Sequence, residues 1–151
     1  MGIFSTVKLF GQIAAELTRA EMALPVCNEQ AEKWRTEAAR LRCLEADVTR
    51  LGAPEIFLHA IRRMMESFEG FESAYRAAVI GCQAALDAAH EKPINGERAI
   101  AALDFSKAAS NLPEQARLHA LAVRLEIQPG WLAGAEVMKR LNSPYWNANY
   151  P

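Results

Sequence analysis

The sequence predicts an all-α protein: an elongated helical bundle with two long helices, the first of them kinked at Pro25, and about three shorter helices. Apolar residues recur along most of the chain at alternating steps of three and four, which is the period of one face of an α-helix. Residues that begin and end helices, chiefly Asn, Pro and Gly, separate these periodic segments. No segment shows a convincing strand pattern with a period of two, so no sheet is expected.

The composition is that of an ordinary globular protein. The chain has 151 residues, of which 51% are hydrophobic and 23% are charged, and its formal net charge is −1. This length suits one domain that buries a core without disulfides or metals, and we assign that domain to residues 1–142, with residues 143–151 as an extended tail. The net charge provides no global field that would attract nucleic acid or an anionic membrane.

Cysteine usage and hydropathy indicate a reducing compartment and no membrane span. Cys27, Cys43 and Cys82 fall at apolar helical positions, cannot all pair internally and form no CxxC motif. We interpret them as reduced core thiols of a cytoplasmic protein, and disulfide use is the less favoured alternative. No apolar run approaches the roughly 18 residues that cross a bilayer.

The first long helix is expected to run from the N-terminus to Gly52. Its beginning carries an apolar stripe of Ile3, Val7, Phe10, Ala14, Leu17 and Leu24. Pro25 removes a backbone donor and disfavours helix at the residue before it, so we expect a kink or break there. Beyond the proline the helix is expected to resume in a new register, with an apolar seam at Cys27, Trp34, Leu41 and Val48.

The second long helix begins after Pro54 and stops before Pro93, and it gives the strongest signal in the chain. Its apolar seam keeps the alternation of four and three over five heptads, through Phe57, Ile61, Met64, Phe68, Phe71, Tyr75, Ala78, Cys82, Ala85 and Ala89. At a rise of 1.5 Å per residue this helix would span about 50 Å. It must therefore run the full length of a bundle or project beyond it.

A second stripe on the same helix consists of small residues: Gly70, Ala74, Ala77, Gly81, Ala84 and Ala88. A glycine inside a helix costs roughly 1 kcal/mol relative to alanine, and a close approach of a neighbouring backbone would offset that loss. We therefore predict that the bulky seam faces one helix and the small stripe another. The alternative is chance spacing in a chain rich in alanine.

Three shorter helices are expected after Pro93. Asn95 can cap the first, whose apolar side has Ala99, Ile100 and Leu103. Asn111, followed three residues later by Glu114, is a variant capping box for the second. That helix is expected to end at Pro129-Gly130 and to bury Leu118, Leu121, Ala122 and Leu125. The last helix carries Trp131, Leu132, Ala135, Met138 and Leu141.

Aromatic residues in the C-terminal tail suggest a role in binding. Tyr145, Trp146 and Tyr150 fall within six residues of one another, and such side chains anchor protein interfaces because they bury much area at low conformational cost. A tail that folds back onto its own bundle is an equally weighted alternative. Ile80, which interrupts the polar side of the second long helix, adds a further apolar group for self-association or docking into a larger assembly.

Arginines in the first half of the chain raise the alternative of nucleic-acid binding. If adjacent helices brought Arg50, Arg62 and Arg63 together, they would form a modest patch for RNA or DNA phosphates. Acidic residues interleave with nearly all the arginines of this region, so a solvated surface of mixed charge is favoured over a nucleic-acid interface.

Catalytic patterns are weak. Asp87-x-x-His90 and the pair of Glu55 and His59 are the nearest approach to the carboxylate and histidine ligands of a metal-binding bundle. By helical rise these two pairs lie about 47 Å apart, so they cannot share one site within a subunit. We therefore predict no catalytic residues, no metal and no cofactor.

The sequence thus favours a non-enzymatic structural or adaptor subunit that acts through helix–helix contacts and its aromatic tail, within an oligomer or a larger assembly. The second hypothesis is a helical subunit of a nucleoprotein complex that contacts phosphates through arginines. The third is a metal-dependent helical-bundle enzyme.

Overall fold

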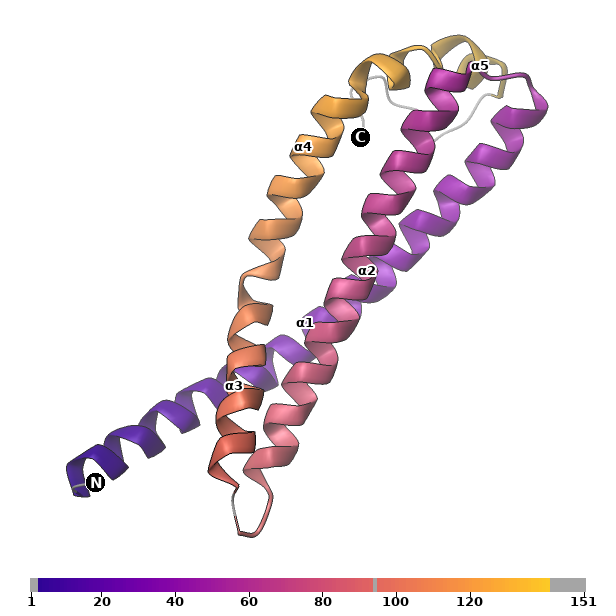
Figure 1. Cartoon of the computed structure of the whole chain (residues 1–151). Helices are drawn as coiled ribbons and strands as arrows, with labels where there is room; N and C mark the ends of the chain where they lie inside the picture. Colours follow the sequence, from indigo (N-terminus) through magenta and orange to yellow (C-terminus); the bar gives the residue numbers. More distant parts are fainter. Residues whose placement is uncertain (1–2, 94, 142–151) are drawn as a thin grey trace. The chain divides into compact units, whose positions relative to one another are not determined.

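The structure, a computed structural model, describes the backbone of residues 3–93 and 95–141, and the side chains of these residues except 3–10, 12 and 13. The described residues form five α-helices and no strand (Figure 1). The helices are α1 (Ile3–Arg50), α2 (Glu55–Ala89), α3 (Gly96–Ser110), α4 (Leu112–Leu132) and α5 (Ala135–Leu141). The predicted all-α fold, with two long and three shorter helices, is confirmed.

Contacts between residues divide the chain into two compact units, which we describe separately. Unit 1 comprises Met1–Ala31 and Ser73–Pro113, and so contains the first part of α1, the second part of α2 and all of α3. Unit 2 comprises Glu32–Glu72 and Glu114–Pro151, with the remainder of α1 and α2, almost all of α4, and α5. Both units contain buried apolar side chains.

The core of unit 1 contains two thiols and many small residues. Cys27 of α1 and Cys82 of α2 are almost fully buried, as is Tyr75. Burial, together with the neighbouring Cys82 thiol, raises the pKa of Cys27, and burial raises the pKa of Cys82. Both thiols therefore stay protonated near neutral pH and act as small apolar side chains.

Cys43 corrects one sequence prediction, because this thiol is exposed rather than part of a core. It follows the buried Leu41 by two residues, which is about 200° around the helix. Cys43 therefore lies on the side of α1 opposite its buried stripe.

Large side chains from four helices fill the core of unit 2. They are Leu41 and Val48 of α1, Phe57, Ile61, Met64, Phe68 and Phe71 of α2, Val123, Ile127 and Trp131 of α4, and Val137 and Met138 of α5. The rings of Phe57 and Trp131 pack in a tilted arrangement with centroids 5.4 Å apart, a geometry that aromatic pairs prefer. Burying one such side chain stabilises a fold by roughly 1.5–3 kcal/mol, so these contacts dominate the stability of unit 2.

Helix α1 is one continuous helix (Figure 1). Pro25 lies inside it, so the break considered from the sequence is absent. The predicted change of register is also wrong: the buried Ala20 lies seven residues before the buried Cys27, so the same stripe continues across the proline. Pro25 itself is exposed, and its ring does not interrupt the packed side. Much of the predicted N-terminal stripe falls on side chains that the structure does not describe.

The boundaries and the seam of α2 agree with prediction. Gly52 has a φ of 75°, a conformation that favours glycine after a helix end. The Pro54 carbonyl accepts hydrogen bonds from the N–H groups of Phe57 and Leu58 at 3.0 and 3.2 Å, which starts α2. Nine of the ten predicted seam residues are buried and Ala89 is half-buried. This regular seam positions α2 within both cores.

The shorter helices confirm one predicted cap and correct another. The Asn95 side chain accepts a hydrogen bond from the Arg98 N–H at 3.2 Å and caps α3 as predicted. Asn111 does not begin α4 through a capping box; its N–H donates to the Ala108 carbonyl at 3.2 Å and closes α3. Because α4 follows at once, the two helices share this turn.

The end of α4 also differs from prediction, because Pro129-Gly130 lies inside the helix rather than at its end. Gly130 is buried, and a Cβ added to it would lie 2.6 Å from the Ile56 carbonyl oxygen of α2. A Cβ at Gly134 would overlap the ring of Phe57. These glycines let α4 and the following turn pack directly against the start of α2.

Candidate functional site

Helix α4 carries apolar residues on two faces. Val123, Ile127 and Trp131 are buried in the core of unit 2. Four leucines of the same helix are exposed, and we name them the leucine stripe: Leu118, Leu121, Leu125 and Leu132. Their exposed fractions run from 45% for Leu121 to 72% for Leu125. This stripe is the most regular exposed apolar feature of the described residues.

The leucine stripe has the spacing of a helix-packing seam. Leu118, Leu125 and Leu132 are seven residues apart, and Leu121 lies three residues after the first. Residues at these intervals line one side of a helix, and in coiled coils they insert between the side chains of a facing helix. The stripe therefore has the pattern required to bind another helix.

The exposure of these leucines corrects the sequence prediction that α4 buries Leu118, Leu121, Ala122 and Leu125; all four are exposed. Both faces of α4 are apolar, and the helix can bury only one of them against the other helices of unit 2. The face that includes Trp131 is the buried one, because the large indole contributes the greater burial and packs against Phe57.

Polar side chains border the leucine stripe. Arg117 donates two hydrogen bonds to Glu114, at 3.0 Å from Nε and 2.7 Å from a terminal nitrogen. These bonds, and the positive charge beside it, hold the pKa of Glu114 below its ordinary value. Glu126 accepts a hydrogen bond from Arg63 of α2 at 3.1 Å. Exposed pairs of this kind contribute little stability, but an apolar centre with a polar border is the usual anatomy of a protein interface.

The small-residue stripe of α2 is covered only in part. Its buried members are Gly81 and Ala88, its half-buried members Ala74 and Ala84, and its exposed members Gly70 and Ala77. A Cβ at Gly81 would lie 3.0 Å from the Cβ of Phe105 in α3, whereas one at Gly70 would meet nothing within 4 Å. A close helix approach therefore exists at Gly81 and not at Gly70. Binding of another chain by the stripe stays a prediction.

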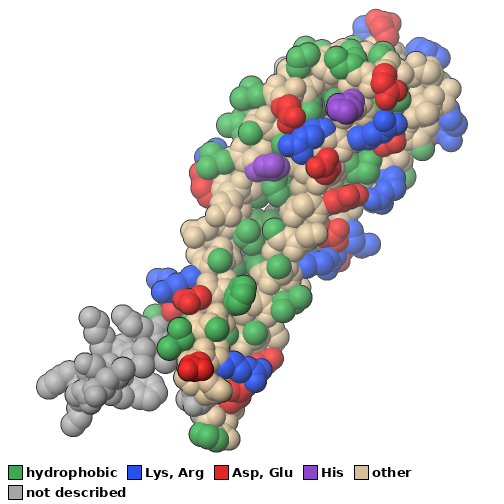
Figure 2. All heavy atoms as spheres, viewed as in Figure 1, with side chains coloured by type: hydrophobic (Ala, Val, Ile, Leu, Met, Phe, Trp, Pro, Cys, Tyr) green, Lys and Arg blue, Asp and Glu red, His purple; other side chains and the backbone are tan. Residues whose placement is uncertain are grey.

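Unit 1 exposes a smaller apolar group. Ile80 of α2 is 71% exposed, and Phe105 and Ile100 of α3 are also exposed. In the face shown in Figure 2, hydrophobic side chains lie among interspersed acidic and basic ones. The predicted tail residues lie outside the described part of the chain: Tyr145, Trp146 and Tyr150.

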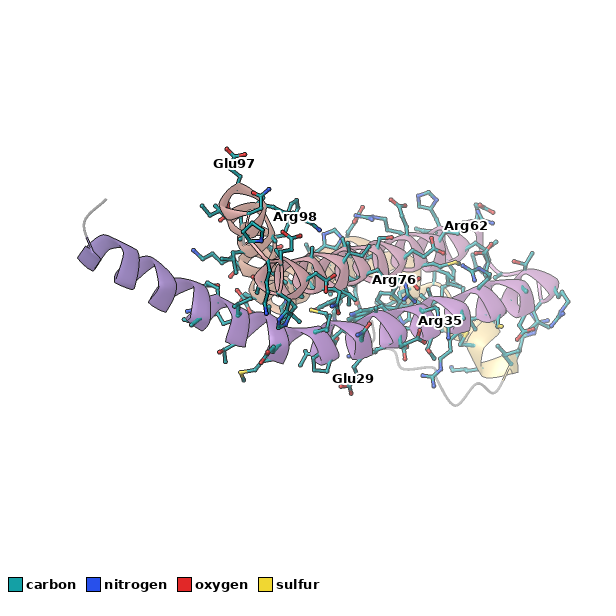
Figure 3. The ribbon with its side chains drawn as sticks, turned by 90° about the horizontal axis from the view of Figure 1, so that it is seen from below. Glu29, Arg35, Arg62, Arg76, Glu97 and Arg98 are labelled. Carbon is teal, nitrogen blue, oxygen red and sulfur yellow. The ribbon has the colours of Figure 1, made fainter. Side chains whose placement is uncertain are left out.

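The three arginines considered for phosphate binding are all engaged by carboxylates. The pairs are Arg50 with Asp47, Arg62 with Glu45 and Glu55, and Arg63 with Glu66 and Glu126. Arg62, labelled in Figure 3, contacts its two partners at 3.2 and 3.3 Å. A phosphate group would have to compete with a carboxylate for each guanidinium, which weakens the case for a nucleic-acid interface.

Unit 2 also contains a small cavity beside a cluster of rings. The ring centroid of Trp34 lies 5.0 Å from that of Phe68 and 4.9 Å from that of Phe71. The ring of His119 in α4 packs edge-on against Phe71, with the two centroids 5.5 Å apart. The cavity has a volume of about 130 Å³, and among its lining residues are Trp34 of α1, Met64, Ser67 and Phe68 of α2, and Ala120 and Arg124 of α4.

Sequence reasoning missed both the leucine stripe and the cavity. The sequence does show the spacing by seven of Leu118, Leu125 and Leu132, and it shows a second apolar face on the same helix. Together these patterns indicate that one of the two apolar faces stays exposed. The cavity has no comparable signal, because packing brings together Trp34 and Ser67 from two helices.

The two acid–histidine pairs considered as metal ligands from the sequence belong to different units. Glu55 and His59 belong to unit 2, whereas Asp87 and His90 belong to unit 1. Across the described residues, no group of three or more His, Cys, Asp or Glu side chains could hold a metal ion. The same residues include no helix with the length and apolar character of a membrane span.

Comparisons with known proteins do not assign the chain to a family: no family model, no curated protein and no solved structure matches it. Any function must therefore be argued from the residues themselves. Among the described residues, the leucine stripe of α4 and the cavity of unit 2 are the features on which the argument for a function rests.

Proposed function

We propose that the chain is a non-enzymatic structural or adaptor subunit that binds protein through helix–helix contacts, within an oligomer or a larger assembly. The observation that carries this proposal is the exposed leucine stripe of α4. Monomeric soluble proteins rarely expose contiguous apolar patches of large size, and those that do generally use them for binding. The stripe also has the heptad spacing of a coiled-coil seam.

The occupant that we assign to the leucine stripe is the same stripe of a second copy. A twofold axis brings identical surfaces together, so a continuous apolar seam is complementary to itself. The net charge of −1 does not oppose association of two copies. The three free cysteines support the further proposal that this assembly works in a reducing, cytoplasmic compartment.

The test is the molar mass of the purified full chain, measured by light scattering across a range of concentrations. We expect a dimer, and we expect the double variant Leu121→Glu with Leu125→Glu to be monomeric, because four carboxylates would be buried without partners at the seam. The matched control is Met22→Glu with Val26→Glu, which changes two exposed apolar residues of α1 in the same way and should remain dimeric.

A chain that stays monomeric at every concentration would refute self-association through the stripe and leave only a different protein partner. If deletion of residues 145–151 abolishes the dimer while the α4 variant remains dimeric, the interface lies in the aromatic tail and not in the leucine stripe. Circular dichroism of each variant checks that the helices are intact.

A nucleoprotein subunit remains the second proposal, with less support, because carboxylates engage Arg50, Arg62 and Arg63. A metal-dependent enzyme remains the third. It has no particular observation in its favour.

A further inference from the structure

Two buried polar atoms in unit 2 lack a hydrogen-bond partner among the described residues: Trp34 Nε1 and Ser67 Oγ. Ser67 is 4% exposed. Both side chains line the cavity described above. Buried polar groups in folded proteins nearly always find a partner, so two unpaired groups beside one cavity require an explanation.

A second buried serine shows that the helix itself could have satisfied Ser67. Ser106 of α3 is 3% exposed, and its hydroxyl donates to the Leu103 carbonyl at 3.0 Å. Ser67 is equally buried within a helix but makes no such bond. Its hydroxyl is therefore available to a group in the cavity.

We propose that this cavity binds a small carboxylate whose apolar body is a single ring or a branched chain. The volume of about 130 Å³ is close to the roughly 150 Å³ of an engineered apolar cavity that binds benzene. Trp34 and Phe68 supply aromatic walls, and Met64 supplies an apolar one. A ligand of the size of one ring fits this space.

The polar groups determine the chemistry of the ligand. The indole N–H of Trp34 can only donate a hydrogen bond, and the hydroxyl of Ser67 can donate a second, so the ligand must offer an acceptor. Arg124 of α4 lines the same cavity and brings a positive charge. Two donors beside a guanidinium favour a carboxylate over a neutral acceptor.

Binding requires a small movement, because solvent does not reach either polar atom. Met64 lines the cavity, and its unbranched thioether can change rotamer at little cost. We expect a shift of this side chain to let the ligand oxygens approach Trp34 Nε1 and Ser67 Oγ. The site is independent of the leucine stripe and of the function proposed for it.

The test is a titration of the full chain, labelled with ¹⁵N, with benzoate, benzamide and toluene. The chain has three tryptophans, and the variant Trp34→Phe identifies the indole N–H signal of Trp34 by its disappearance. We expect saturable movement of this signal with benzoate at millimolar concentration, weaker binding of benzamide and the weakest binding of toluene. No movement with benzoate would overturn the proposal. Equal affinity for toluene would show that the polar atoms take no part.

The affinities of variants, measured by calorimetry, distinguish a binding site from a simple defect in packing. Ser67→Ala and Trp34→Phe should each lower the affinity for benzoate roughly two- to tenfold, because each variant removes one hydrogen bond. Ser106→Ala is the matched control and should leave the affinity unchanged. Arg124→Gln should weaken the binding of benzoate and leave the binding of toluene unchanged. Ala120→Leu should abolish the binding of both ligands, because the larger side chain would fill the cavity. If Ser67→Ala behaves like Ser106→Ala, the assignment of the hydroxyl is wrong.

Discussion

Glycine at position 130 lets α4 lie directly against the first turn of α2. An added Cβ would come within 2.6 Å of the Ile56 carbonyl oxygen and 3.2 Å of the Ala60 Cβ. The oxygen belongs to the backbone of a helix and cannot rotate away. At Gly70 the surrounding space is open, and glycine there only lowers the helix propensity of α2.

Replacing glycine by alanine is expected to change the free energy of unfolding in opposite directions at these two sites. We expect Gly130→Ala to lower the free energy of unfolding by roughly 1–3 kcal/mol, since overpacking forces the backbones apart. Gly70→Ala should raise it by about 0.5–1 kcal/mol, because alanine is the better helix former and nothing obstructs its methyl group. Urea unfolding followed by circular dichroism measures both. Equal shifts of the same sign would show that the close approach at Gly130 is absent.

Among the helices, α1 tolerates a proline in its interior. The ring at Pro25 removes one backbone hydrogen bond from the helix, yet the buried stripe continues from Ala20 to Cys27 and Ala31. Burial of this stripe in unit 1 offsets the weakness at the proline. Local stability of α1 should therefore be lower in the turn around this residue than in the buried turns after it.

We expect Pro25→Ala to raise the free energy of unfolding by about 1–3 kcal/mol, because alanine restores an N–H donor and removes a steric conflict. The exposed position of the ring means that little packing is lost. Amide hydrogen exchange should show increased protection in the turn around residue 25. A decrease in stability would mean that a bend imposed by the proline is required for the packing of unit 1.

The regularity of a pattern determined how well each helix could be predicted. The seam of α2 is deep, unbroken and buried for nine of ten residues, so periodicity alone located it. In α4 two apolar faces compete, and the outcome depends on where Trp131 finds a partner in α2, which local sequence does not reveal. The same holds for the cavity, where Trp34 and Ser67 meet only through tertiary packing.

Considered as a whole, the chain is nearly neutral and its charges are well mixed. Lysine and arginine total 17 against 18 acidic residues, and ion pairs on α1, α2 and α4 hold many of the arginines. Figure 2 shows both signs interspersed over the face in view. Such a surface gives little attraction to a polyanion, because neighbouring carboxylates cancel the field of each guanidinium.

We therefore expect weak retention on heparin at physiological salt, and no measurable change with the double variant Arg62→Ala and Arg63→Ala. Binding that depends on phosphate contacts falls steeply with salt, so a chain that makes few such contacts should elute near the start of a salt gradient. The comparison uses the same column and salt gradient for both proteins. Strong retention that the double variant abolishes would instead support the nucleoprotein hypothesis.

The exposure of Cys43 gives the chain a natural point of chemical attachment. Cys27 and Cys82 are buried with raised pKa values, so a maleimide reagent should modify Cys43 and spare the other two. One spin label can thus be introduced per subunit without mutagenesis. If two copies associate as proposed, the distance between their labels would report the orientation of one copy relative to the other.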